Sequence, residues 1–153
     1  MDEYPLQIKN YYFPHQSVTA NPNHDANGRK DGNLLKLNVN VTPIEGRIGS
    51  FAITVTLSLD EEASENPLYF FDIQAFGIFN QASNLPAEVA RQLAALPVEE
   101  KQRLAAKTGG NILIGAIRER LADLTCRAPW GIFILDYSPV VFQASPPVGQ
   151  STE

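Results

Sequence analysis

Alternation of apolar and polar residues predicts three strands of a half-buried sheet. Every second side chain is apolar from residue 51 to 59, and the segment 33–42 alternates in the same way. Residues 42–47 supply a turn between them, so the two segments predict a β-hairpin. A further alternating strand runs from about residue 68 to 79. Its apolar face would carry Tyr69, Phe71, Ile73 and Ala75, with Asp72 and Gln74 on the opposite face.

The segment before these strands contains one more predicted strand and a long connection. Residues 6–13 are rich in aromatic and β-favouring side chains, which indicates a first strand. Residues 21–32 are rich in Asn, Pro and Gly. Because this stretch is too long for a tight hairpin, it predicts a mobile loop or a crossover.

Helical spacing replaces the alternation after residue 79. Asn84 is a candidate N-cap, Pro97 marks a second helix start, and Gly109-Gly110 predict an interruption. The strongest helical stripe then follows and stops before Pro129. This stripe consists of Leu113, Ile117, Leu121 and Leu124. Strands followed by helices predict an α+β domain with a mostly antiparallel sheet.

Composition indicates one soluble domain. The chain has 153 residues, is 44% hydrophobic and contains a single cysteine, which favours a reducing compartment. We expect one domain over residues 1–143, a disordered tail over 144–153, and a cytoplasmic location without a signal or membrane span. A formal net charge of −5 argues against a nucleic-acid partner. The densest basic cluster, Arg118, Arg120 and Arg127, is interrupted by acidic residues.

Candidate catalytic or ligand-binding chemistry is sparse. His15 and His24 are the two histidines, and they lie in loop-like sequence without metal-ligand spacing. The acidic cluster at 60–65 lies on a predicted turn, and Gly109-Gly110 lack the lysine of a phosphate-binding loop. The sequence therefore predicts no enzyme, no cofactor and no metal.

The chain has more large apolar residues than its predicted core faces require, and these residues bear on its function. One explanation is a subunit interface or ordinary core, and the other is a groove for other polypeptides. The two explain these residues equally well, and one does not exclude the other. The residues are Tyr11, Tyr12, Phe13, Phe70, Phe76, Phe79, Trp130, Phe133 and Tyr137.

Three segments, in order, resemble the SecB family of export chaperones. They are Phe71-Asp72-Ile73-Gln74 with Gly77-Ile78-Phe79, then Asn111-Ile112-Leu113 with Arg118-Glu119, and then Ser138-Pro139-Val140-Val141-Phe142. Weaker similarity at residues 6–8 and 58–62 extends the resemblance over most of the chain.

This resemblance implies a four-stranded antiparallel sheet with a long helix on one face, and a homotetramer built as a dimer of dimers. It implies a holdase that binds unfolded polypeptides without ATP. The implied client groove comprises Leu35, Leu37, Phe76, Ile78, Phe79, Trp130, Phe133 and Tyr137. The implied oligomer interface comprises Phe71, Ile73, Ala75, Leu113, Ile117 and Leu121. Asp72 would lie where the family docks the translocation ATPase.

Departures from the family pattern concern the partner more than the fold. His15 and Thr19 stand where the family carries acidic residues, the family's second helix is missing after Phe142, and the helical sequence at 84–107 is longer than expected. An antitoxin of a toxin–antitoxin pair is therefore an alternative client to exported proteins. Two rival functions stay open: a small-ligand-binding or enzymatic α+β domain with a closed pocket, and an adaptor for one fixed partner.

Overall fold

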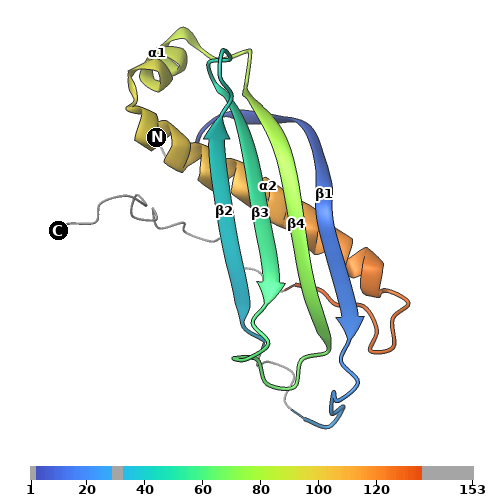
Figure 1. Ribbon diagram of the computed structural model, residues 1–153. Coiled ribbons are helices and arrows are strands. Elements are labelled where there is room, and N and C mark those ends of the chain that lie inside the picture. The colour runs from blue at the N-terminus through green and yellow to red at the C-terminus, as the bar shows by residue number, and fades with distance from the viewer. Residues whose placement is uncertain (1–2, 29–32, 136–153) are drawn as a thin grey trace, which may run out of the picture.

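The fold is a four-stranded antiparallel sheet with one long helix across one side (Figure 1). A computed structural model describes residues 3–28 and 33–135. The elements are β1 (Leu6–Ala20), β2 (Leu35–Pro43), β3 (Ser50–Leu59), β4 (Tyr69–Gln81), α1 (Ala87–Ala95) and α2 (Val98–Thr125). The predicted α+β class, the β2–β3 hairpin and the strand β4 are confirmed.

The strand order is β1-β4-β3-β2, so β1 pairs with the strand most distant from it in sequence. β1 extends seven residues beyond the predicted end at Phe13, because register shifts between Ile8 and Asn10 and between Tyr12 and His15 let the strand continue. Proline lacks an amide hydrogen and is tolerated on an edge strand or at a bulge. Pro14 lies at the second shift, on an edge strand, and therefore does not end β1.

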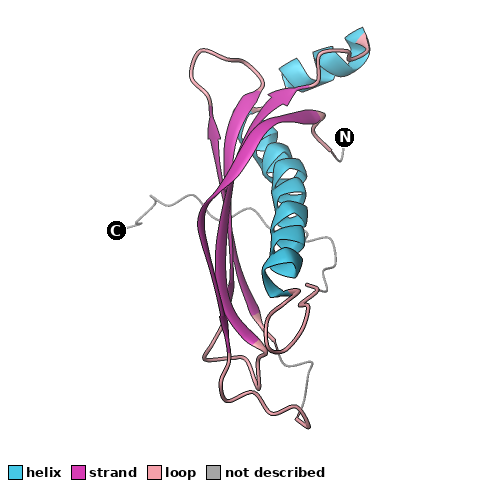
Figure 2. Cartoon of the chain, turned by 90° about the vertical axis from the view of Figure 1, so that its right-hand side faces the viewer, coloured by secondary structure: helices cyan, strands magenta, loops and turns pink. Residues whose placement is uncertain are grey.

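The two sides of the sheet differ because side chains alternate along each strand. From residue 51 to 59 in β3 and from 69 to 79 in β4, the odd-numbered residues are buried and the even-numbered ones are at least partly exposed. α2 covers one side of the sheet (Figure 2). We call that side helix-facing and the other helix-free.

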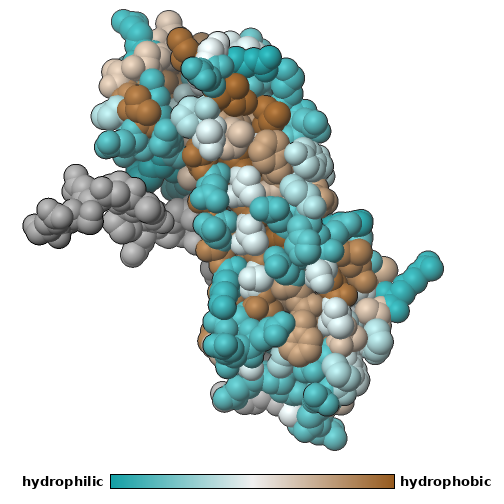
Figure 3. Space-filling model, viewed as in Figure 1, coloured by the Kyte–Doolittle hydropathy of each residue, from teal (hydrophilic) through white to brown (hydrophobic). Residues whose placement is uncertain are grey.

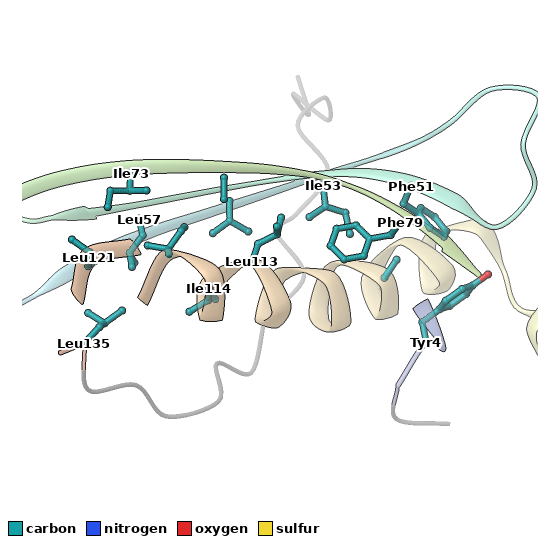
Figure 4. Packing of buried hydrophobic residues seen from close by; sticks show 14 of the residues in the cluster. Tyr4, Phe51, Ile53, Leu57, Ile73, Phe79, Leu113, Ile114, Leu121 and Leu135 are labelled. Carbon is teal, nitrogen blue, oxygen red and sulfur yellow. The ribbon is translucent and has the colours of Figure 1, made fainter. Parts of the chain in front are cut away.

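α2 is continuous over 28 residues, so the predicted interruption at Gly109-Gly110 is wrong. Both glycines are buried. A Cβ on Gly109 would lie 2.2 Å from Ile53 Cδ1, which means that the missing side chain lets the helix approach β3 closely. Figure 4 shows the apolar side chains packed in this layer between the sheet and α2. The low helix propensity of glycine is thus offset by the close packing of α2 on β3. The sequence around Gly109 gives no indication of this packing.

Two further details of the helices differ from the prediction. α1 begins after Pro86, which occupies the N-cap position without a side-chain hydrogen bond, so Asn84 is not the cap. On α2, Leu113, Ile117 and Leu121 are fully buried as predicted, but Leu124 is 37% exposed. The apolar stripe therefore ends one turn earlier than the sequence pattern indicates.

Tyr4 fastens the segment before β1 to the core. Its ring is buried against Phe51, with the centroids 5.5 Å apart. Its hydroxyl donates to Gln81 Oε1 at 3.0 Å, and its backbone N–H donates to Thr108 Oγ1 at 3.2 Å. Burial raises the pKa of the Tyr4 hydroxyl above its ordinary value of 10.0, because an apolar surrounding disfavours the phenolate.

This raised pKa predicts a loss of stability in alkali. The folded state holds the Tyr4 proton more tightly than the unfolded state, so its contribution is complete below pH 10 and is lost as the pH rises through the folded pKa. We expect the free energy of unfolding to fall less steeply above pH 10 in Tyr4→Phe than in the native protein. Urea titrations across that range measure both slopes, and equal slopes would contradict the prediction.

Candidate functional site

The chain leaves α2 and runs along the helix-facing side of the sheet as a short segment, residues 130–135, which we call the strap. Four hydrogen bonds hold it. The Tyr69 hydroxyl accepts from the Trp130 backbone N–H at 3.0 Å and donates to the Gly131 carbonyl at 2.7 Å. The Trp130 indole N–H donates to the Asn21 carbonyl at 3.0 Å. The beginning of the strap is therefore tied to both β4 and the end of β1.

Thr125, the last residue of α2, holds the middle of the strap. Its hydroxyl is fully buried, donates to the Leu121 carbonyl at 2.7 Å and accepts from the Phe133 backbone N–H at 2.7 Å. A buried amide hydrogen without a partner costs about 1–3 kcal/mol. The Thr125 hydroxyl thus removes the free-energy cost of an unpaired Phe133 amide. It also fixes the direction in which the strap leaves the helix.

Aromatic contacts fill the space beneath the strap. The Phe133 ring lies 6.2 Å from the Tyr69 ring and 5.5 Å from the Phe71 ring, measured between centroids. At its start, the Trp130 ring meets the His24 ring edge to face at 4.9 Å. His24 in turn bonds through Nδ1 to the Asn66 carbonyl at 3.1 Å, so the predicted long connection is partly anchored to the β3–β4 loop.

Apolar side chains on the strap alternate between the core and the surface. Phe133 packs inward and Leu135 is 3% exposed, whereas Ile132 and Ile134 are 55% and 59% exposed. Alternating side chains of an extended segment stand about 7 Å apart on one side. The strap therefore exposes Ile132 and Ile134 to solvent on one side, while hydrogen bonds and inward side chains hold its backbone on the other side.

The predicted client groove is divided among three places. Leu35 and Leu37 lie opposite the buried Leu59 and Leu57, hence on the helix-facing side, at the end of the sheet where the strap also lies. Phe133 belongs to this region as described above. Trp130, 36% exposed, belongs there as well. These four residues are brought to one end of one side.

The other predicted groove residues are elsewhere. Phe79 is fully buried beneath α2. Phe76 and Ile78 alternate with it and lie on the helix-free side, where the Phe76 ring contacts the Tyr12 ring at a tilt, with centroids 5.2 Å apart. Figure 3 shows this side as a mixture of hydrophobic and hydrophilic patches. Tyr137 lies outside the described residues.

The six predicted interface residues are all in the core of the single chain. Phe71 and Ile73 face α2 from β4, and they are 5% and 0% exposed. The remaining four, Ala75, Leu113, Ile117 and Leu121, are also 0% exposed. The sheet and α2 of one chain already bury these side chains.

Asp72 lies on the helix-free side and is exposed, as predicted from its parity in β4. Its Oδ2 is 3.9 Å from Nε2 of His15, but both side chains are more than half exposed, which makes this a weak contact. Ser17 is its partner in β1, and Thr19 pairs with Phe70. Asp72 is thus surrounded by neutral side chains and one histidine.

A catalytic site is not evident in the described part of the chain. No group of three or more His, Cys, Asp or Glu residues there could hold a metal ion. Among the described helices, none is both long and apolar enough to cross a membrane. The ion pair between Glu100 and Arg103 lowers the pKa of Glu100 through direct hydrogen bonds, but both groups are at the surface of α2.

Sequence reasoning missed the residues that anchor the strap. Asn21, Tyr69 and Thr125 contact it across 109, 61 and 8 positions respectively, so their roles depend on the folded arrangement. The sequence does not identify the outward isoleucines either. Residues 132–135 are Ile-Phe-Ile-Leu, so every position is apolar and hydrophobic periodicity cannot separate the exposed pair from the inward pair.

A likeness to one solved structure supports the fold. No protein-family model matches the chain, and no curated protein matches its sequence. The chain is similar to a SecB-like chaperone of Mycobacterium tuberculosis, solved in complex with a ChAD peptide from the HigA1 antitoxin. The TM-score is 0.55 at 17% identity, over 90% of this chain and 94% of that chain. A protein of unknown function from Streptococcus agalactiae is also similar, with a TM-score of 0.45 at 11% identity over 88% of this chain and 98% of the other. The first likeness shows that the chain has a SecB-like fold.

Proposed function

We propose that the chain is a SecB-like holdase, which binds non-native polypeptides reversibly and without ATP. The observation that carries the proposal is the pair Ile132 and Ile134, exposed on a strap whose other side is fixed by buried contacts. Exposed apolar side chains on a preformed surface favour binding of apolar segments, since little ordering is needed on association. The fold supports this choice, because a chaperone of the same fold binds an antitoxin peptide.

The client would bind in an extended form along the strap. Within the described part of the chain, the backbones of Ile132 and Ile134 make no hydrogen bond. An extended client could therefore pair with this backbone while its alternate side chains contact the isoleucines. Leu34 and Leu35, 55% and 38% exposed at the same end of the sheet, would extend the apolar surface.

The class of client and the assembly belong to the same proposal. An antitoxin segment is favoured over delivery to the translocation ATPase, because Asp72 is the one acidic side chain on the helix-free side of β1 and β4. The proposal also places client binding in the cytoplasm. The binding species would be a homotetramer assembled as a dimer of dimers. Sedimentation equilibrium would test the tetramer.

Aggregation of a chemically denatured protein gives a direct test of the holdase. We expect the native chain at stoichiometric amounts to slow the rise in light scattering, and the variant Ile132→Ser/Ile134→Ser to lose most of this effect. Replacing two exposed isoleucines removes apolar contact worth about 1–2 kcal/mol each, or roughly tenfold in affinity per residue. Trp130 is the single tryptophan of the chain and lies on the strap, so its fluorescence reports client binding at this place.

A matched control keeps the test specific. Ile48 is also fully exposed, but it lies at the β2–β3 turn, far from the strap along the sheet. Ile48→Ser is therefore expected to protect the client as well as the native chain does. The holdase proposal fails if the native chain does not slow aggregation. If both serine variants protect equally, clients bind at some other surface.

A further inference from the structure

A groove lies at the opposite end of the sheet from the strap, between the β2–β3 turn and the beginning of α2. Its volume is about 390 Å³. Its walls include Ile44, Arg47, Ile48, Phe51, Val98 and Lys101. We call it the hairpin groove. The strap, in contrast, contacts Tyr69 and Asn21, at the end of the sheet where β4 begins.

Apolar side chains form much of the hairpin groove and remain open to solvent. Ile48 is fully exposed and Val98 is 65% exposed, while Phe51 is buried and closes the floor. Leaving two aliphatic side chains this exposed on opposite walls of one groove has no benefit for the stability of the single chain. Apolar residues gathered in this way are typical of a surface that binds another polypeptide.

Two unpaired cations stand among these apolar residues. In the described part of the chain, neither Arg47 nor Lys101 makes a side-chain hydrogen bond or an ion pair. Arg103, on the same helix, is instead paired with Glu100. No acidic residue lines the groove, although the whole chain carries a formal net charge of −5. The nearest acids in sequence are Glu45, Glu99 and Glu100, and none of them is part of its walls. Glu45 and Glu99 are exposed, and Glu100 is paired with Arg103.

The turn that forms one wall is held in place before any partner arrives. Ile44 N–H donates to the Ser50 carbonyl at 2.9 Å, and Ser50 N–H donates to the Arg47 carbonyl at 3.2 Å. Gln81 N–H donates to the Gly49 carbonyl at 2.8 Å, which ties the turn to the end of β4. Gly49 has φ of 79°, a conformation that side chains disfavour. Binding would therefore require little ordering of this wall.

We propose that the hairpin groove docks an acidic segment of a second protein, in which carboxylates alternate with aliphatic side chains. The aliphatic groups would contact Ile48 and Val98, and the carboxylates would pair with Arg47 and Lys101. The positive charge of this groove, on an otherwise acidic protein, would favour apolar segments that carry acidic residues over apolar segments that do not. Because the strap lies at the other end of the sheet, this docking does not depend on the proposed holdase activity.

Fluorescence polarisation with the full chain tests this docking. The probe is a labelled peptide of alternating Leu and Glu, compared with a Leu–Lys peptide and a Ser–Glu peptide of the same length. We expect the Leu–Glu peptide to bind more tightly than either control, by about tenfold or more, and to weaken as salt is raised. Equal affinity for the Leu–Lys peptide would overturn the proposal.

Variants locate the site on the protein. Arg47→Glu/Lys101→Glu should weaken Leu–Glu binding by at least about tenfold, since attraction becomes repulsion at two places. Ile48→Ser should weaken it without changing the salt dependence. Lys9→Glu/Arg127→Glu, which reverses two exposed cations outside the groove, is the charge-matched control for the double variant. Unchanged binding by the double variant overturns the proposal. A fall in solution mass for Ile48→Ser also overturns it, because the groove would then join copies of this chain.

Discussion

Gly109→Ala is expected to lower the free energy of unfolding by about 2 kcal/mol, although alanine is the better helix former. The new Cβ would lie 2.2 Å from Ile53 Cδ1 and 3.4 Å from the Phe79 ring. Ile53 and Phe79 are fully buried, so neither can move into open space. Overpacking of about 3 kcal/mol would then outweigh the gain of about 1 kcal/mol in helix propensity. Urea denaturation followed by circular dichroism measures the difference.

Gly115→Ala is the matched control on the same helix. A Cβ at this position would have no neighbour within 4 Å, so only the propensity gain of about 1 kcal/mol should remain. The two substitutions are therefore expected to have opposite signs. A second check is Ile53→Val, which removes the clashing Cδ1 atom and should make Gly109→Ala less harmful in the double variant. If Gly109→Ala stabilised the protein as Gly115→Ala does, the close approach of α2 to β3 would be wrong.

Thr125→Val is expected to release the strap while leaving α2 in place. Valine keeps the shape of the side chain but removes the hydroxyl that accepts from the Phe133 N–H at 2.7 Å. The amide is then left without its partner, at a cost of about 1–3 kcal/mol. Hydrogen exchange of the Phe133 amide should become faster by a factor of about ten or more. Client binding at Ile132 and Ile134 should weaken with it, because their backbone would no longer be fixed.

Thr125→Ser distinguishes the contribution of the Thr125 hydroxyl from that of its methyl group. Serine keeps the acceptor for the Phe133 N–H and loses one buried methyl, worth about 1 kcal/mol of stability. The strap should therefore keep slow exchange in this variant even though the protein is less stable overall. Similar protection of Phe133 in the valine variant and the native chain would show that the strap is held by its aromatic contacts alone.

The strands could be predicted because their periodicity is a local property that the folded sheet preserves. The alternation in β3 and β4 assigned each side chain to the correct side, including the exposed Asp72. The same parity, applied to the proposed groove, would have separated Phe76 and Ile78 from Phe79. That division between the two sides of the sheet was available from the sequence alone.

The features that could not be predicted depend on contacts between distant residues. Gly109 is a helix breaker by propensity, and only the position of Ile53 explains why a glycine is suited to this place. The continuation of β1 beyond Pro14 depends on its edge position next to β4. The hydrogen bonds that position the strap join residues such as Trp130 and Asn21, for which no spacing rule exists.

The strand order has a consequence for how the chain forms during its own synthesis. β1 precedes β4 in the sequence, yet its pairs, such as Leu6 with Gln81, join residues about as far apart as the sheet allows. The β2–β3 hairpin can close as soon as both strands have left the ribosome, whereas β1 has no partner until β4 follows. For that interval β1 is a 15-residue unpaired strand bearing Tyr11 and Tyr12. We therefore expect the nascent chain to pass through a state that resembles the unfolded clients it is proposed to bind, with the folding of β1 as the slow, late step.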